Sequence, residues 1–366
     1  MSETSRQDAA VFGTACMKTL LIGAGLTIMP LAAAAAPHVD HSARVGSGVH
    51  EVVHADHGNR LFVTATGASG DDGGGAVLQL DPESLKLQQR IAMPARAYGL
   101  AMNHETGMLY TTNTDDRSVS VIDAASGEVI KTLKLERDEA TVLEGEQLTR
   151  PHEAVVDEAH NRIYISGVSR DGVIWVLDGK SNELTDAIEG IGDTPTGVAL
   201  DTENQNLYVT LRKSDAVIEI NLDNHSVTRR YDTQGSGPVS VALDRQRQRL
   251  LVANRSSGSV DVIDLGSGQT QQSIDTGAGA MDITLDDEGE RIYVTNHDAG
   301  TVTILDADDY NRLADLDIGA QPEDVAVEAD GRVAWVTGQA GTDDNDTSAE
   351  GDDGAREDTV SRILSR

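Results

Sequence analysis

The stretch RIYVTNHDAGTVTILDA, residues 291–307, contains two runs in which apolar and polar side chains alternate, separated by a turn of Asn, His, Asp and Gly. Alternation with a period of two, in segments rich in Val, Ile, Tyr and Thr, is typical of half-buried β-strands, and the residues between the runs are those that reverse a chain. The stretch therefore predicts a β-hairpin.

The same pattern occurs seven times along the chain. Its equivalent positions are Phe62, Tyr110, Tyr164, Tyr208, Leu251, Tyr293 and Trp335. They lie 48, 54, 44, 43, 42 and 42 residues apart. A short apolar strand precedes each hairpin and another strand follows it, and four-stranded sheets repeated around a channel form a β-propeller. We therefore predict an all-β fold, a seven-bladed β-propeller of four-stranded antiparallel blades.

The two ends of the chain favour a closed ring. The seventh copy shows only three strands, the third being DTVSRIL at 358–364, whereas residues 40–46 precede the first copy in the phase of a fourth strand. We predict that residues 40–46 complete the last blade, so that the N-terminal strand of the mature chain closes the ring and removes a free edge. Residues 37–366 would then form one propeller domain, with an acidic loop at 338–358.

The segment MKTLLIGAGLTIMPLAAAAAP has a basic start, an apolar centre and an Ala-rich end. This is the layout of a cleaved secretory signal, so we predict a signal peptide over 1–36, with Met17 as an alternative start, and a periplasmic or secreted protein. The apolar run is short for a membrane span, and an uncleaved anchor is the alternative. Cys16 is the only cysteine, so the mature chain is expected to have neither disulfides nor thiol chemistry.

The chain is strongly acidic. It has 61 Asp and Glu against 29 Lys and Arg, a net charge of −32, and only six of the basic residues are lysines. A high net charge keeps a protein soluble when salt screens its charges, so this composition is what we expect of a salt-adapted organism.

The string HEVVH at 50–54 matches the zinc-protease motif H-E-x-x-H. That chemistry needs a helix, whereas the repeat phase places this string on a first strand, aligned with HEAVV at 152–156 and DITLD at 282–286. On a strand the two histidines would lie about 13 Å apart, too far to share one zinc ion. The chain also lacks a G-x-S-x-G elbow, a P-loop and G-x-G-x-x-G. Catalysis therefore finds little support.

One repeat position carries a possible metal or polar-ligand site. His50 and Glu51 occupy the same position in the first blade as His152 and Glu153 in the third, where the innermost strand begins at the channel mouth. Such a pair of dipeptides could converge on a metal ion or a polar ligand. The alternative is that these polar side chains simply meet water.

Basic residues recur on one face of the predicted propeller, just past the second strand of several blades and in the loops that enter the first strands. The candidate ligand-binding residues are Arg96, Tyr98, Arg150, His152, Arg170, Arg212, Arg255 and His297. They could hold an anion or nucleic-acid phosphates, with Tyr98 stacking on a base. Acids such as Asp115 and Asp298 lie among them, so local salt bridges are the alternative.

The repeat, with YVTN intact at 293–296, resembles the YVTN-repeat propellers over nearly the whole mature chain. Related propellers include a lactonase, quinoprotein subunits and haem-carrying domains, so the resemblance specifies fold more than function. It is also similar to an exported bacterial member of this family, which implies a periplasmic binding protein with affinity for single-stranded DNA. The net charge of −32 argues against DNA binding, since phosphate contacts weaken as salt rises.

We therefore expect an exported, monomeric, non-enzymatic binding protein without a cofactor, which engages a ligand or partner on the basic face. The alternative is a cofactor-dependent or lactonase-like enzyme, or a propeller that carries a metal, quinone or haem at the channel mouth.

Overall fold

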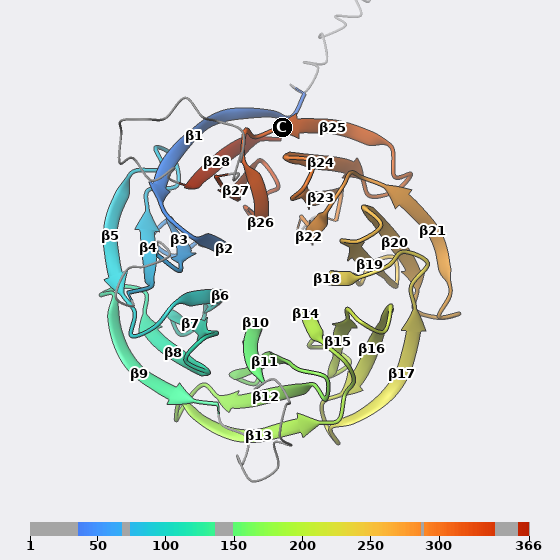
Figure 1. The fold of residues 1–366 in the computed structure, drawn as a ribbon, viewed down its shortest axis with the longest axis horizontal. Helices are drawn as coiled ribbons and strands as arrows, with labels where there is room; N and C mark the ends of the chain where they lie inside the picture. The colour runs from blue at the N-terminus through green and yellow to red at the C-terminus, as the bar shows by residue number, and fades with distance from the viewer. Residues whose placement is uncertain (1–35, 68–73, 136–148, 287–288, 341–357, 366) are drawn as a thin grey trace, which may run out of the picture. The chain divides into compact units, whose positions relative to one another are not determined.

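The computed structural model describes residues 36–67, 74–135, 149–286, 289–340 and 358–365. These residues form 28 β-strands, arranged as seven antiparallel sheets of four strands around a central axis (Figure 1). The described residues contain no helix, and so they contain no helix that could cross a membrane. The all-β, seven-bladed prediction is confirmed. The predicted signal peptide and acidic loop fall almost wholly outside the described residues.

The blades follow one another along the chain. Blade 1 is β2 (Val49–Ala55), β3 (Arg60–Ala65), β4 (Ala76–Leu80) and β5 (Leu87–Ala92), and blade 2 is β6 (Ala97–Asn103), β7 (Met108–Asn113), β8 (Ser118–Asp123) and β9 (Glu128–Lys134). Blade 3 is β10 (Arg150–Asp157), β11 (Arg162–Val168), β12 (Val173–Asp178) and β13 (Glu183–Glu189), and blade 4 is β14 (Pro195–Asp201), β15 (Asn206–Leu211), β16 (Ala216–Asn221) and β17 (Ser226–Asp232). Blade 5 is β18 (Pro238–Asp244), β19 (Arg249–Asn254), β20 (Ser259–Asp264) and β21 (Thr270–Asp275), and blade 6 is β22 (Ala280–Leu285), β23 (Arg291–Asn296), β24 (Thr301–Asp306) and β25 (Arg312–Asp317). Blade 7 is β26 (Gln321–Val327), β27 (Val333–Gln339), β28 (Asp358–Leu364) and β1 (His38–Gly46).

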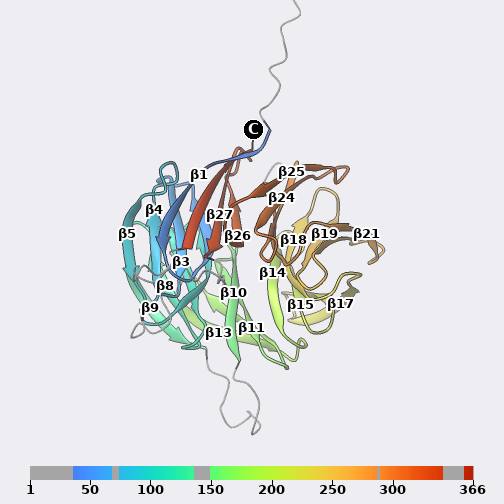
Figure 2. The same ribbon diagram turned by 45° about the horizontal axis from the view of Figure 1, so that its top comes forward.

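The ring is closed by the N-terminal strand, as the sequence predicts. Strand β1 runs antiparallel to β28, from His38 opposite Leu364 to Gly46 opposite Asp358, and lies on the outside of blade 7 (Figure 2). The strand extends two residues beyond the predicted 40–46. It occupies the edge of β28 that would otherwise carry unpaired backbone groups.

The core lies between neighbouring sheets. The aromatic residue of the repeated motif is buried there in six blades, as Phe62, Tyr110, Tyr164, Tyr208, Tyr293 and Trp335. Trp335 also donates a hydrogen bond from Nε1 to the Pro82 carbonyl of blade 1, at 2.9 Å. Trp175 and Trp335 were expected in the core, and both are buried.

The threonine of the YVTN motif links each blade to the next. In blade 6 the Thr295 Oγ1 accepts a hydrogen bond from the Asp282 backbone N–H at 2.8 Å and donates one to the Glu323 carbonyl of blade 7 at 3.1 Å. The same two bonds are made by Thr64, Thr112, Ser166, Thr210 and Thr337. Only blade 5 lacks the hydroxyl, because it carries Ala253 opposite Ser240. The hydroxyls hold the innermost strands in a common register, which sets the level at which their side chains enter the channel.

Candidate functional site

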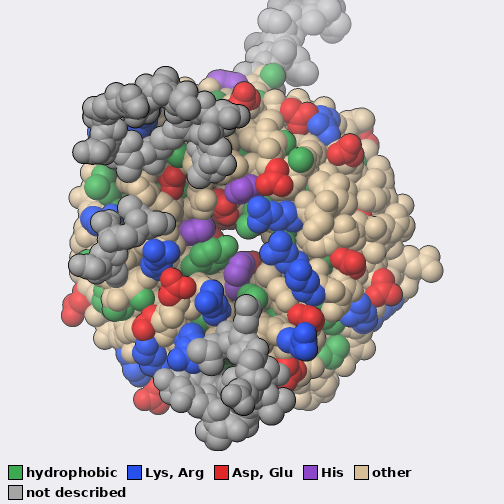
Figure 3. Space-filling view, in the orientation of Figure 1, with side chains coloured by type: hydrophobic (Ala, Val, Ile, Leu, Met, Phe, Trp, Pro, Cys, Tyr) green, Lys and Arg blue, Asp and Glu red, His purple; other side chains and the backbone are tan. Residues whose placement is uncertain are grey.

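A cavity of about 290 Å³ lies at the axis, lined by the innermost strands of all seven blades. One residue from each of these strands forms what we call the mouth ring: His50, Tyr98, His152, Thr196, Val239, Met281 and Glu323. Figure 3 shows a central opening in this face of the molecule, with His, Lys and Arg side chains beside it.

A register shift in the innermost strand of every blade explains why consecutive residues line the channel. In β2 the pairing jumps from Val49 opposite Ala65 to Val52 opposite Val63, and equivalent shifts occur in the other six first strands. Such a bulge re-aims side chains that strict alternation would send to opposite faces. His50 and Glu51 therefore both face the cavity.

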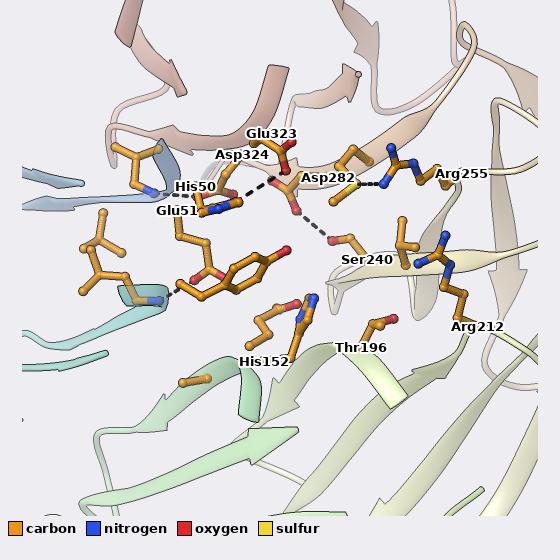
Figure 4. A pocket seen from close by; sticks show the side chains of 18 residues that line it. His50, Glu51, His152, Thr196, Arg212, Ser240, Arg255, Asp282, Glu323 and Asp324 are labelled. Carbon is orange, nitrogen blue, oxygen red and sulfur yellow. Dashed lines mark hydrogen bonds and ion pairs between the residues drawn. The ribbon is translucent and has the colours of Figure 1, made fainter. Parts of the chain in front are cut away.

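The residues that follow the mouth ring supply four carboxyl groups, Glu51, Glu153, Asp282 and Asp324, which we call the carboxyl ring (Figure 4). Each carboxyl accepts a backbone N–H from the next blade. The donors are Leu100, Val198, Val325 and Val52, at 2.5, 3.3, 3.3 and 2.7 Å. Asp282 also accepts the Ser240 hydroxyl at 2.8 Å. Because every bond crosses a blade boundary, the carboxyl ring is held by the closure of the propeller.

Burial favours the protonated form of Glu51, Glu153 and Asp324. It raises the pKa of Glu51 to about 8, with the charge of Asp282 adding to the effect. The pKa values of Glu153 and Asp324 are raised well above the ordinary range by burial and by the charges of the neighbouring acids. Like charges in one confined space favour the neutral form, so the ring does not ionise fully at neutral pH.

Three aromatic side chains of the mouth ring lie in a row. The ring centroids of His50 and Tyr98 are 4.3 Å apart, and those of Tyr98 and His152 are 4.8 Å apart. Burial lowers the pKa of His152 to about 4, helped by the charges of His50 and Arg212, so this imidazole is neutral at physiological pH. Burial likewise raises the pKa of Tyr98, which stays a neutral phenol. Tyr98 and His152 are therefore an uncharged part of the cavity wall.

Glu323 carries the fixed negative charge of the mouth ring. Its Oε1 lies 3.1 Å from His297 Nε2, and its Oε2 lies 3.9 Å from His50 Nδ1. Burial opposes its ionisation, but the hydrogen bond from His297 and the nearby His50 imidazole outweigh burial and hold its pKa at about 2. The same bond from Glu323 raises the pKa of His297. The charge of Glu323 is therefore compensated by the neighbouring histidines.

Arg212 and Arg255 reach the cavity from the turns that follow β15 and β19 (Figure 4). The Arg255 guanidinium lies 3.6 Å from Asp298 and 3.5 Å from the Met281 sulfur. The Arg212 side chain is half-buried, and within the described part of the chain its guanidinium has neither a hydrogen bond nor an ion pair. Both arginines also line a second cavity of about 290 Å³, beside Ser256 and Gly279.

The structure brings together half of the predicted ligand-binding residues. Tyr98, His152, Arg212 and Arg255 line the channel cavity, and His297 lies behind Glu323. Three others stay on the surface. Arg96 is 3.8 Å from Asp115, whereas Arg150 and Arg170 are exposed outside the cavity lining. Local ion pairing, the alternative considered from the sequence, thus holds for Arg96, Arg255 and His297.

His50, Glu51, His152 and Glu153, the metal ligands suggested by the sequence, all line the cavity. The Tyr98 ring, however, lies between the imidazoles of His50 and His152 and separates them. Across the described ranges, no group of three or more His, Cys, Asp or Glu is arranged to hold a metal ion. The second histidine of HEVVH, His54, stacks on Trp335 at 4.5 Å instead of facing the mouth.

Sequence reasoning missed Asp282, Glu323 and Asp324. The alignment of DITLD with HEVVH placed Asp282 opposite His50, and this register is wrong by one residue. Asp282 is equivalent to Glu51, since the backbone N–H of each bonds the threonine hydroxyl of the second strand. The dipeptides at 281–282 and 323–324 occupy the position of His50-Glu51. An alignment of all seven repeats at that position could have identified Asp282, Glu323 and Asp324 from the sequence.

The propeller has known relatives. The family described as YNCE-like beta-propeller matches residues 100–343. A protein of Escherichia coli K12 named "Uncharacterized protein YncE" is 33% identical over 220 residues, 60% of this chain and 62% of the relative. The protein of the same name from Salmonella typhimurium LT2 is 36% identical over 192 residues, 52% and 54% of the two chains. The chain thus matches less than two thirds of the length of these relatives, whose names assign no activity. The family match covers more than half of the sequence, and the chain belongs to the YNCE-like beta-propellers.

Proposed function

We propose that this protein is a non-enzymatic binding protein that takes up a small ligand at the channel mouth through an anionic group. The observation that carries the proposal is the Arg212 guanidinium, which lines the cavity half-buried and lacks an acceptor among the described residues. A partly desolvated cation without a partner is unfavourable, and a carboxylate or phosphate on it forms charge-assisted hydrogen bonds.

Arg255 supports the same role. Its guanidinium reaches the same cavity, and its ion pair with Asp298, at 3.6 Å, is long. An anion between the two arginines would gain shorter bonds from both. The cavity volume of about 290 Å³ suits a ligand at the small end of the usual range.

The described groups of the site favour binding over catalysis. Glu323 is paired with His297 and lies 3.9 Å from His50, and one oxygen of each carboxyl in the ring accepts a backbone N–H. The leader pattern in residues 17–37 supports the further proposal that the ligand is met outside the cytoplasm.

The test is binding of acetate, butyrate, succinate and inorganic phosphate, measured by calorimetry and by thermal shift. We expect at least one of these anions to bind, and the double variant R212Q/R255Q to bind it about tenfold or more weakly, as for the loss of hydrogen bonds to charged groups. The matched control is R170Q, which removes an exposed arginine outside the cavity lining and leaves binding unchanged. Equal affinity in R212Q/R255Q and the native protein would refute the proposal, and turnover of a bound compound would favour the enzyme alternative.

A further inference from the structure

We propose that the ligand of this cavity is zwitterionic: its anionic group lies on Arg212 and Arg255, and a cationic group such as an ammonium lies on the carboxyl ring. The inference rests on the proposed function, because it takes the arginine pair as the anion site. It adds a cation site in the same cavity and so names the chemical class of the ligand.

The first argument is the separation of charge around the cavity. The arginines enter from blades 4 and 5, whereas Glu51, Asp282 and Asp324 come from blades 1, 6 and 7 (Figure 4). Glu153 comes from blade 3. A ligand with two negative ends would place one of them among buried acids. A ligand with one end of each sign matches both walls, which is the complementarity that gives polar sites their specificity.

The second argument is the acceptor capacity of the carboxyl ring. Within the described residues, one oxygen of Glu51 and one of Glu153 accept a backbone N–H, and no hydrogen bond is made by the other oxygen of either group. An ammonium group has three donors and no acceptor, so it suits such oxygens.

The third argument is electrostatic. Glu51, Glu153 and Asp324 are desolvated and crowded by other acids, and both effects raise their pKa values, so they keep protons in the absence of a compensating cation. A bound ammonium would supply that compensation and displace protons, since an opposite charge within a few ångströms favours the ionised form. Binding of the cationic group should therefore release protons to the solvent.

Apolar side chains line the same cavity as the charged groups. Val239 and Met281 belong to the mouth ring, and Leu100 and Ala154 also line the cavity. They offer contact to a short hydrocarbon segment, so the ligand joins its two charges through a few methylene groups or a structure of similar size.

The experiment compares matched pairs of probes in the full protein. The probes are γ-aminobutyrate, δ-aminovalerate and ε-aminocaproate, each against the monocarboxylate of the same length: butyrate, valerate and caproate. We expect the best amino acid to bind at least tenfold more tightly than its monocarboxylate. Calorimetry near pH 7.5 in buffers of different ionisation enthalpy should show proton release for the amino acid and none for the monocarboxylate.

Variants locate the cation. E51Q and D324N keep an oxygen that can accept the N–H of Leu100 or Val52, and each should reduce the preference for the amino acid about tenfold. The matched control, E105Q, changes an exposed acid in the turn after β6 and should keep the preference. Thermal melts verify folding, and if one variant does not fold the proton-release measurement on the native protein still decides.

The possible failures are distinguishable. If monocarboxylates bind in a manner that depends on the arginines, and the amino acids bind no more tightly and release no protons, the zwitterion inference is wrong and the anion site stands. If no probe shows affinity that depends on Arg212 and Arg255, both proposals are wrong.

Discussion

The bond that links blade 6 to blade 7 gives a quantitative test of how the ring is held. Thr295 is fully buried. Its hydroxyl accepts a hydrogen bond from the Asp282 N–H at 2.8 Å and donates one to the Glu323 carbonyl at 3.1 Å. Replacing Thr295 with Val keeps the shape of the side chain and removes both bonds. One partly buried donor and one partly buried acceptor then lack a protein partner, at about 1–3 kcal/mol each. Since carbonyl groups tolerate the loss better, we expect T295V to lower the free energy of unfolding by about 2–4 kcal/mol.

The assay is urea unfolding followed by circular dichroism, with the change in midpoint converted at constant slope. T295S should lose much less, because Ser166 makes the same two bonds in blade 3. T228V is the exposed control, on outer strand β17, and should change stability by no more than about 0.5 kcal/mol. A T295V protein as stable as T228V would refute the reasoning that the YVTN threonine holds the blades together.

Three further predictions concern the closing strand β1, the carboxyl ring and the basic face. Deletion of residues 38–46 removes β1 and exposes the edge of β28, so the melting temperature should fall sharply and light scattering should rise; a deletion protein as stable as the full chain would contradict this. Glu51 titrates near 8 when folded and near 4.5 when free, so between these values the unfolded chain releases a proton that the folded protein keeps, and stability falls as pH rises. The advantage of E51Q over the native protein in urea midpoint should therefore grow from pH 5 to pH 8, and an equal difference at both values would be evidence against a raised pKa. Single-stranded oligonucleotide should bind no more tightly than about micromolar, with a salt slope of about 0.7 per phosphate that flattens when Arg170, Arg212 and Arg255 become Ala; nanomolar, salt-sensitive binding lost in that variant would show that the acidity was misread.

The sequence by itself determined the architecture. Apolar alternation in 291–307 and its six relatives specifies strands and turns, and the number of copies specifies seven blades, because each repeat buries its apolar faces against its neighbours. The phase of residues 40–46 was sufficient to predict the closing strand. These features depend on local patterns, so they can be read from one chain.

The site was decided by the tertiary structure. Strict alternation would send His50 and Glu51 to opposite faces of β2, and the bulge that turns both into the channel has no signature in a period-two pattern. The carboxyl ring depends on contacts such as that between Asp324 and the Val52 N–H, which are 272 residues apart in the chain. Such contacts exist only because the ring closes. The angle between adjacent blades then decides which side chains face the central channel together. A sequence pattern records the partners of a strand within its own blade, but not the side chains that seven blades bring to one point.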